Sequence, residues 1–449
     1  MATETRISSA AAVCAAALLA ALPAATTSVS ANHEHQPAAA APVEELDGDE
    51  IELMGNAGHA KDSIKPKVTA FFTQESYGPG DRATLVVTDK APSVAVQIFR
   101  AGGESSETVP SDVMLGTPVG NPVQIGSVNG RRALSIHMGA WTSGVYFARL
   151  TAPGARVGYA PFILRPKQLG EHRIAVVMPT QTWQAYNFRD DNGDGHPDTW
   201  YAGWKKLQAR LIRPFLNRGV PPHWKRYDAP FVRWLTSTHR DVDFLSDAEL
   251  RRVGDGKKLA DAYSLIVFSG HHEYVTTHEY DVVTQYRDLG GNLAFLAANN
   301  FFWKITIKSN VMTRVGQWRD LGRPEAALIG VQYRANDRGG HRGPWTLRSG
   351  SATTPWLFAQ MGVKEGDSVG NGGIEIDSTS AASPKDVKVL AEIPNLYGPG
   401  FTAQMTYYET PSGARVFAAV AFSLASSVWT PDLGRLMSNL WERLATDKP

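Results

Sequence analysis

The sequence has only one cysteine, Cys14, in a chain of 449 residues. Cys14 lies in an alanine-rich and leucine-rich segment at the start of the chain. Catalysis by a thiol is therefore excluded, because no other position can supply the thiolate that such chemistry needs. Disulfide bonds are excluded in the same way, so we expect stability to depend on the size of the hydrophobic core.

An excess of charge of one sign is also lacking, since Lys and Arg total 45 and Asp and Glu total 44. Without a global positive field, a nucleic-acid partner is not expected. After residue 31, no apolar run approaches the roughly 20 residues that span a bilayer. We therefore expect a soluble mature protein that is not held in a membrane.

The first 31 residues predict a signal peptide. They contain an early Arg6, an apolar core and the small residues Ser30 and Ala31 near a cleavage site, which favours export from a bacterium and an extracellular location. A disordered alanine-rich tail is the alternative. Residues 32–65 are rich in Ala, Pro, Glu and Asp without periodicity, which indicates a disordered linker.

Residues 66–167 have the pattern of a β domain. Short alternating runs at 83–87, 94–99 and 145–150 are separated by turn signals at 78–80 and 101–103. Short strands over about a hundred residues are typical of an immunoglobulin-like β-sandwich. Nothing in this segment forms a catalytic set, so its expected role is structural or adhesive.

Residues 168–449 predict an α/β domain of the flavodoxin-like type. Strand patterns alternate with helical patterns, which favours a mostly parallel sheet covered by helices on both faces. A β-hairpin is expected over 407–422. The expected strands are 173–178, 241–245, 263–268 and 292–297, and the expected helices are 247–253, 278–289 and 433–444.

The strand at 263–268 runs directly into the string SGHHEY, residues 269–274. Ligand sites of open α/β sheets lie at such carboxyl ends. In flavodoxin-like hydrolases and glutamine amidotransferases this corner usually carries a cysteine, whereas here only His, Glu and Tyr are present. The spacing of His271, His272 and Glu273 matches no zinc motif, and capping of the next helix is the alternative to a site.

Further polar and aromatic residues follow other strands. The segments TWQAYN (182–187) and RYDAPF (226–231) each carry a tyrosine, and NNFFW (299–303) supplies an amide beside aromatic side chains. For any single tyrosine, packing in the core with a satisfied hydroxyl is the alternative. Because several strand ends converge at one edge of such a sheet, the joint pattern favours a functional site.

The strings SGHHEYVT and GGNLAFLAANNFFW, with TWQAYN and YDAPF, resemble the catalytic region of the N,N-dimethylformamidase large (beta) subunit and its relatives. The resemblance covers most of residues 170–446, and WTSGVYFARL resembles the β-sandwich that precedes this region in many relatives. It implies a glutamine-amidotransferase-like α/β domain. Members of this family need not share a substrate.

The resemblance also implies a mononuclear ferric ion held by two tyrosines and a glutamate, at the positions of Tyr186, Tyr227 and Glu273. Phenolate and carboxylate oxygens suit a hard cation, which would polarise an amide carbonyl and lower the pKa of bound water.

Other positions match residues that assist the reaction in the family. At these positions, His271 would move a proton to the departing amine, and Asn299 would donate a hydrogen bond to the developing oxyanion. A further acidic residue of the family site is placed at Glu409.

One segment departs from the family. Asp190, Asn192, Asp194 and Asp198 occupy the first, third, fifth and ninth places of a calcium loop with its glycine at the sixth place. The twelfth place is Tyr201 instead of Glu, so the set is incomplete. Calcium binding closed by other oxygens and a solvated acidic turn are the two interpretations.

The leading hypothesis is a secreted, metal-dependent hydrolase of a carbon–nitrogen bond in a small amide, and a small partner subunit or a homo-oligomer is left open. A second hypothesis is a noncatalytic extracellular binding module with a degenerate enzyme fold, in which Phe301, Phe302 and Trp303 form the binding wall. A third is a metal-free acid–base site made of His271 and Glu273.

Overall fold

The computed structural model describes residues 67–102, 110–202, 207–337, 340–422 and 424–446. The predicted signal peptide (1–31) and linker (32–65) lie outside these residues. No helix among the described residues is long and apolar enough to cross a membrane.

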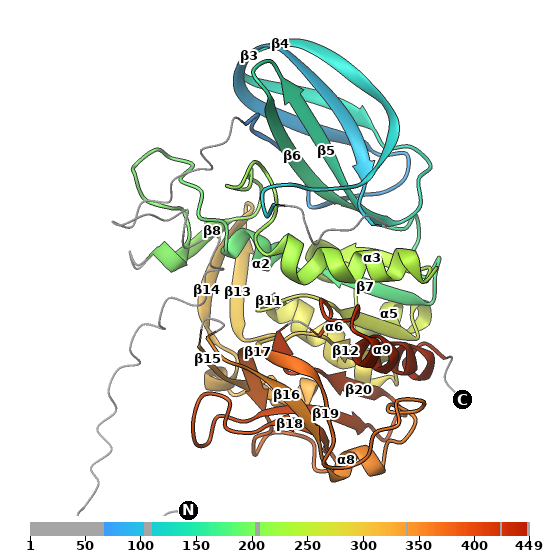
Figure 1. Cartoon of the computed structure of the whole chain (residues 1–449). Coiled ribbons are helices and arrows are strands. Elements are labelled where there is room, and N and C mark those ends of the chain that lie inside the picture. The colour runs from blue at the N-terminus through green and yellow to red at the C-terminus, as the bar shows by residue number, and fades with distance from the viewer. Residues whose placement is uncertain (1–66, 103–109, 203–206, 338–339, 423, 447–449) are drawn as a thin grey trace, which may run out of the picture. The chain divides into compact units, whose positions relative to one another are not determined.

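The first part of the described chain is one six-stranded sheet (Figure 1). Its order is β1-β3-β5-β6-β2, with β4 paired to β3, and register shifts bend β3 between residues 91 and 98. Alternate side chains of these strands fill a core of their own that includes Leu85, Tyr146 and Phe162. The strands are β1 (Ala70–Phe72), β2 (Ser76–Tyr77), β3 (Arg82–Arg100), β4 (Thr117–His137), β5 (Gly144–Ala152) and β6 (Arg156–Leu164).

The second part is built on an eleven-stranded mixed sheet. Five of its strands are parallel neighbours in the order β9-β7-β10-β12-β20. All four residues of β9, β10 and β12 are buried, as expected for parallel strands covered on both faces. These strands are β7 (Ile174–Met178), β9 (Asp243–Ser246), β10 (Leu265–Phe268), β12 (Asn292–Phe295) and β20 (Arg415–Ala418).

The rest of this sheet is antiparallel. The expected hairpin is present as β19 and β20, joined through a turn at Thr410–Ala414. The strands beyond β20 are β19 (Ala403–Glu409), β18 (Lys388–Ile393), β16 (Arg342–Leu347), β17 (Ser368–Ser378), β15 (Gln332–Asn336) and β21 (Ala421–Phe422). A separate four-stranded sheet contains β11 (Tyr274–Thr276), β13 (Trp303–Lys308), β14 (Val311–Gln317) and β8 (Gln208–Arg210).

Helices connect these strands, and two of them begin at reciprocal capping boxes. Ser246 with Glu249 starts α4, and Thr276 with Glu279 starts α6. The α-helices are α2 (Thr180–Ala185), α3 (Ala229–Ser237), α4 (Asp247–Arg252), α5 (Gly256–Ala262), α6 (Thr277–Asp288), α7 (Ala326–Ile329), α8 (Ser349–Ala352) and α9 (Pro431–Leu444). Short turns are the 3-10 helices η1 (Trp200–Ala202) and η3 (Arg319–Leu321) and the π-helix η2 (Trp224–Asp228).

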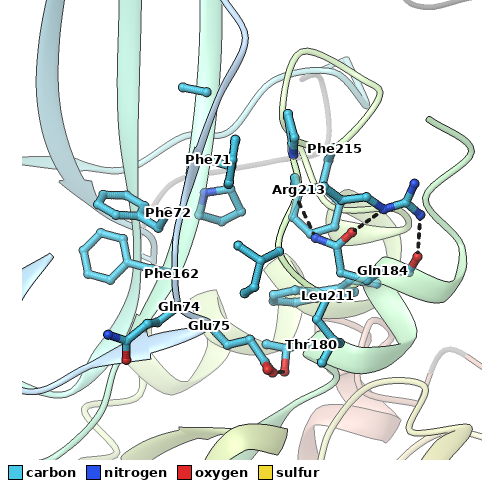
Figure 2. A pocket seen from close by; sticks show the side chains of 15 residues that line it. Phe71, Phe72, Gln74, Glu75, Phe162, Thr180, Gln184, Leu211, Arg213 and Phe215 are labelled. Carbon is cyan, nitrogen blue, oxygen red and sulfur yellow. Dashed lines mark hydrogen bonds between the residues drawn. The ribbon is translucent and has the colours of Figure 1, made fainter. Parts of the chain in front are cut away.

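The six-stranded sheet is bonded to the α/β part by buried polar groups. The Ser143 hydroxyl donates to the Leu164 carbonyl at 2.9 Å and accepts from the Phe244 amide at 2.8 Å. Figure 2 shows a pocket between the two parts, with Phe72 and Phe162 on one side and Leu211 and Phe215 on the other. The immunoglobulin-like and flavodoxin-like assignments of the two parts stay predictions.

Gly219 offers a test of this junction. Its φ is +90°, and a Cβ placed there would lie 1.8 Å from the Tyr159 carbonyl oxygen. We expect Gly219→Ala to lower the free energy of unfolding by about 2–4 kcal/mol, because it combines a left-handed conformation with a clash against the backbone.

Chemical denaturation measures this loss, and Gly400→Ala is the matched control. Gly400 has a φ of +86° and no atom within 4 Å of its Cβ position, so that variant should lose only the about 1–2 kcal/mol of backbone strain. Equal losses in the two variants would show that the close approach at Gly219 does not matter.

Candidate functional site

The site lies at the carboxyl edge of the parallel strands. The chain passes from β7 to β9 on one side and then to β10 on the other, so the strand order reverses between β7 and β10. Such a switch point is where open α/β sheets bind their ligands. Tyr186 follows β7, His271 and Glu273 follow β10, and Asn299 follows β12.

The corner after β10 requires a glycine. A Cβ on Gly270 would lie 2.5 Å from an Asp228 carboxylate oxygen and 3.0 Å from the Pro179 ring. Burial raises the pKa of Asp228 to about 7, although the Trp183 indole donates to its carboxylate at 2.9 Å. This close packing sets the direction in which the chain leaves β10.

Glu273 is the centre of the site, and its side chain is fully buried. The Tyr186 hydroxyl donates to its Oε2 at 3.0 Å, and the Tyr201 hydroxyl donates to the same atom at 3.1 Å. The Glu273 backbone amide donates to the Thr182 hydroxyl at 3.2 Å. A buried carboxylate needs such donors, because its desolvation would otherwise cost several kcal/mol.

His271 completes the cluster. Its Nδ1 lies 3.2 Å from the Ala298 carbonyl oxygen, which can only accept, so Nδ1 carries the proton of the neutral ring. Its Nε2 lies 3.1 Å from Glu273 Oε2 and 3.3 Å from the Tyr186 hydroxyl. The Glu273 carboxylate oxygen can only accept, so its contact with Nε2 is a hydrogen bond only when Nε2 also carries a proton.

Tyr227 reaches the cluster through ring contacts. Its ring stacks on His223 with centroids 5.0 Å apart, and the His223 ring lies 5.5 Å from Tyr186. Tyr227 also packs with Ala298, whose carbonyl binds His271. Of the three predicted ligand positions, Tyr186 and Glu273 are joined by a direct hydrogen bond, and Tyr227 is linked to them through His223 and Ala298.

Asn299 has the features of a ligand-binding residue. It adopts a φ of 56°, in the left-handed region that Asn tolerates, and its backbone N–H donates to the Asp377 carboxylate at 3.0 Å. Its side chain is fully buried, and neither side-chain polar atom has a hydrogen-bond partner among the described residues. An unsatisfied buried amide indicates a missing partner, such as a bound substrate or water.

Two groups of residues at the site were not predicted. Tyr201 was considered only as a place in the calcium loop, yet its ring stacks on Tyr186 at 4.6 Å. Glu375 and Asp377 are buried on β17, and they share the face of the strand that meets Asn299. Two acidic residues alternating with isoleucines in the string IEID were the available signal.

Glu409 does not belong to this cluster, and the structure corrects its prediction. It is exposed at the end of β19, where it accepts from the Tyr407 hydroxyl at 2.6 Å. Its partner in the ladder is Arg415, the first residue of β20. Because β19 is antiparallel to the strands that form the site, its last residue lies at their amino edge, opposite the site.

The expected aromatic wall is also corrected. Phe301, Phe302 and Trp303 are all buried. Phe302 and Trp303 pack in the cluster that contains Tyr186 and Tyr201, and Phe301 packs in the main core. They are therefore core residues and do not form an exposed binding wall.

The loop of the predicted calcium site is closed by its own side chains. Asp190 accepts from the amides of Gly193 and Gly195 at 2.7 and 2.8 Å, and Asp198 accepts from the Asp191 amide at 2.8 Å. Asn192 and Asp194 are exposed, and each accepts the amide two residues on. The four predicted positions thus lie on one compact turn.

The oxygen donors at the centre fit a hard cation. Within the described residues no group of three or more His, Cys, Asp or Glu is arranged to hold a metal, so tyrosine would have to take part. Adjacent ligands of an octahedral ion with bonds near 2.1 Å are about 3 Å apart. The Tyr186 hydroxyl and Glu273 Oε2 are 3.0 Å apart in a hydrogen bond, close enough for both oxygens to reach one ion.

A buried cluster of tyrosine, histidine and glutamate at the ends of the parallel strands of a mixed sheet makes this a protein with a polar site at its strand ends. Comparison with known families is more specific. The family model described as "N,N-dimethylformamidase beta subunit-like, C-terminal" matches residues 125–435 of this sequence. The chain therefore belongs to this family. The predicted resemblance is thereby confirmed.

Two curated relatives are the N,N-dimethylformamidase beta subunits of Paracoccus aminophilus and of an Alcaligenes species. Each is 22% identical to this chain over an alignment of 321 residues that covers 57% of this chain and 42% of the relative. The chain thus spans less than half the length of these relatives.

Among solved structures, a cycloisomaltooligosaccharide glucanotransferase of Paenibacillus sp. matches with a TM-score of 0.17 and 15% identity, over 27% of this chain and 17% of the other. A carbohydrate acetylesterase of Xanthomonas citri matches with a TM-score of 0.15 and 10% identity, over 49% and 57%. Similarity this low supports no argument about fold or function.

Asp377 predicts a pH dependence of stability. Burial raises its pKa from 3.8 to about 8 in the folded state. Between these values the folded protein holds a proton that the unfolded chain has lost, so the free energy of unfolding should fall as pH rises through this range. Asp377→Asn should remove this contribution and flatten the profile.

Denaturation midpoints at several pH values, from about pH 5 to pH 9, measure the slope. Asp386→Asn is the control, because Asp386 is exposed on a turn. Profiles of the wild type and Asp377→Asn that run parallel would contradict the assignment of the proton to Asp377.

Proposed function

We propose that this chain carries the catalytic site of a metal-dependent hydrolase that cleaves a carbon–nitrogen bond of a small linear amide. The observation that carries the proposal is the convergence of Tyr186, His271 and Glu273 within 3.3 Å of one another at the switch point of the sheet. Family membership supports the same reaction class, since the relatives are named as subunits of N,N-dimethylformamidase.

Tyr186, Tyr227 and Glu273 are the proposed ligands of a ferric ion. Two phenolates and a carboxylate neutralise three positive charges, and hard oxygen donors suit such an ion. When bound, the ion supplies Lewis-acid chemistry that polarises a carbonyl and makes water a better nucleophile.

The remaining roles belong to side chains around this set. His271 is held by Ala298 through Nδ1, which leaves Nε2 to exchange a proton, so it can take one from water and return it to the departing amine. Asn299, with a buried amide that has no partner among the described residues, can donate to the oxygen that becomes negative. Burial of the whole cluster strengthens these interactions by excluding water.

The wider assignments are also proposals. The name "beta subunit" of the relatives supports a small partner subunit for this chain, and a homo-oligomer is the alternative. Export by a cleaved signal peptide rests on the pattern of residues 1–31. A calcium ion at the loop 190–198 rests on the spacing of Asp190, Asn192, Asp194 and Asp198.

The metal proposal predicts one iron per chain, with a visible absorption band from charge transfer between tyrosinate and iron. Tyr186→Phe should weaken this band, because it removes one phenolate, and Glu273→Gln should lose most of the iron, because it removes a charged ligand. Elemental analysis and absorption spectra of protein expressed with ample iron measure both effects.

The controls are Tyr407→Phe and Glu409→Gln. These residues form a similar tyrosine–glutamate pair, with 2.6 Å between the two oxygens, at the opposite edge of the sheet. Both controls should retain iron and the band. A wild-type protein without iron would refute the metal-dependent mechanism, and iron that survives in Glu273→Gln would refute the proposed ligand set.

The calcium proposal predicts that Ca²⁺ stabilises the protein against heat. An extracellular site with a dissociation constant of about 10⁻⁴–10⁻³ M would add about 1.4 kcal/mol at ten times that concentration, or a rise in melting temperature of ~2 °C. Asp190→Asn should abolish the rise, whereas Asp386→Asn should keep it. An equal response to Mg²⁺, or no response in the wild type, would refute a calcium site.

A further inference from the structure

Glu273 has a second phenol that the ligand set does not use. The Tyr201 hydroxyl donates to Glu273 Oε2 at 3.1 Å and lies 3.4 Å from Oε1. Tyr201 is buried, and its ring stacks on Tyr186 with an interplanar angle of 20°. It therefore contacts two of the three proposed ligands at once, one by a hydrogen bond and one by its ring.

Tyr201 is held in place by an aromatic cluster. Its ring contacts Tyr274 edge-on at 6.5 Å and Phe188 at the same distance. Phe302 and Trp303 pack in the same hydrophobic cluster. Few rotamers are open to a ring confined in this way, so the direction of its hydroxyl is set by packing.

The chain before Tyr201 ties it to the loop 190–198. Tyr201 lies on η1, two residues after Thr199, whose hydroxyl donates to the Ala185 carbonyl next to Tyr186. The Asp198 amide donates to the Arg189 carbonyl at 2.9 Å, and its carboxylate accepts the Asp191 amide. The loop thus fixes both ends of the segment that runs from Tyr186 to Tyr201.

We propose that Tyr201 is a positioning residue that orients the Glu273 carboxylate for the metal and transmits the order of the loop 190–198 to that carboxylate. This inference rests on the proposed function, because it concerns the same site. Ligating carboxylates are oriented and tuned by hydrogen bonds from groups that do not touch the metal. Tyr201 is placed to donate such a bond to Glu273. The stacking of its ring on Tyr186 would hold Tyr186 and Glu273 in a fixed position relative to each other.

The test is iron binding by Tyr201→Phe, which removes the hydroxyl and keeps the stacked ring. We expect the dissociation constant for Fe³⁺, measured by competition with a chelator, to rise about 10-fold to 100-fold. At saturating iron the charge-transfer band should keep its intensity and move to shorter wavelength. The shift arises because a carboxylate that has lost a hydrogen bond donates more charge, and a more electron-rich ion accepts charge from tyrosinate less readily.

The matched control is Tyr274→Phe. Tyr274 belongs to the same aromatic cluster, but its hydroxyl accepts from the Trp200 indole at 3.2 Å. That variant should leave the position of the band unchanged, which separates orientation of Glu273 from general packing. An unchanged affinity and band in Tyr201→Phe, or an equal shift in Tyr274→Phe, would overturn the inference while the iron site stands.

Two other outcomes are also decisive. A band that loses intensity in Tyr201→Phe at saturating iron would make Tyr201 a ligand and overturn the positioning role. A wild-type protein that binds no Fe³⁺ would overturn the proposed function, and the inference with it.

A double-mutant cycle tests the link to the loop. Asp198→Ala removes the acceptor of the Asp191 amide, so it should weaken Fe³⁺ binding in the wild-type background. If the loop acts through Tyr201, the same change should have little further effect in Tyr201→Phe. Additive effects of the two substitutions would overturn transmission through Tyr201.

Discussion

The burial of one carboxylate constrains the rest of this site. Glu273 is fully enclosed, yet three groups approach its Oε2 atom within 3.1 Å: the hydroxyls of Tyr186 and Tyr201 and the Nε2 atom of His271. A charged or polar group placed in the interior must be satisfied by partners of suitable geometry. Each of these partners is fixed in turn by a strand end, a short helix or an aromatic cluster.

The parallel strands make this arrangement possible. β7, β10 and β12 end at the same edge of the sheet, so Tyr186 meets His271 and Glu273, which lie 85 and 87 positions further along the chain. Buried strands provide a rigid base, whereas the segments after them are free to carry polar residues. The same rule explains why Glu409 was misplaced, since an antiparallel strand ends at the opposite edge.

The buried acidic residues beside the site raise a cost that the fold has to offset. Asp228, Asp377 and Glu279 all have raised pKa values because burial disfavours their charged forms. Raised carboxyl pKa values cluster at functional sites more often than elsewhere in proteins. Two of them border the site, since Asp228 lies against Gly270 and Asp377 accepts from the Asn299 backbone amide.

Sequence patterns were sufficient for the elements of regular period. Continuous apolar runs predicted β7, β10 and β12, and the helices expected at 247–253 and 278–289 are present as α4 and α6. The family motifs pointed to Tyr186, His271, Glu273 and Asn299, because each lies in the short segment after a strand, Tyr186 at the end of the helix α2 that follows β7.

Contacts between distant segments required the tertiary structure. Glu375 and Asp377 lie on a strand whose register with β15 and β16 includes irregularities, and no local pattern predicts which face such a strand presents to Asn299. Tyr201 appeared in the sequence as a missing calcium ligand, and only the folding of its loop onto Tyr186 brought its hydroxyl to Glu273. The sequence by itself determined which residues stand at the strand ends, because that depends on neighbours along the chain. The tertiary structure decided which of them meet, because that depends on strand order, direction and packing.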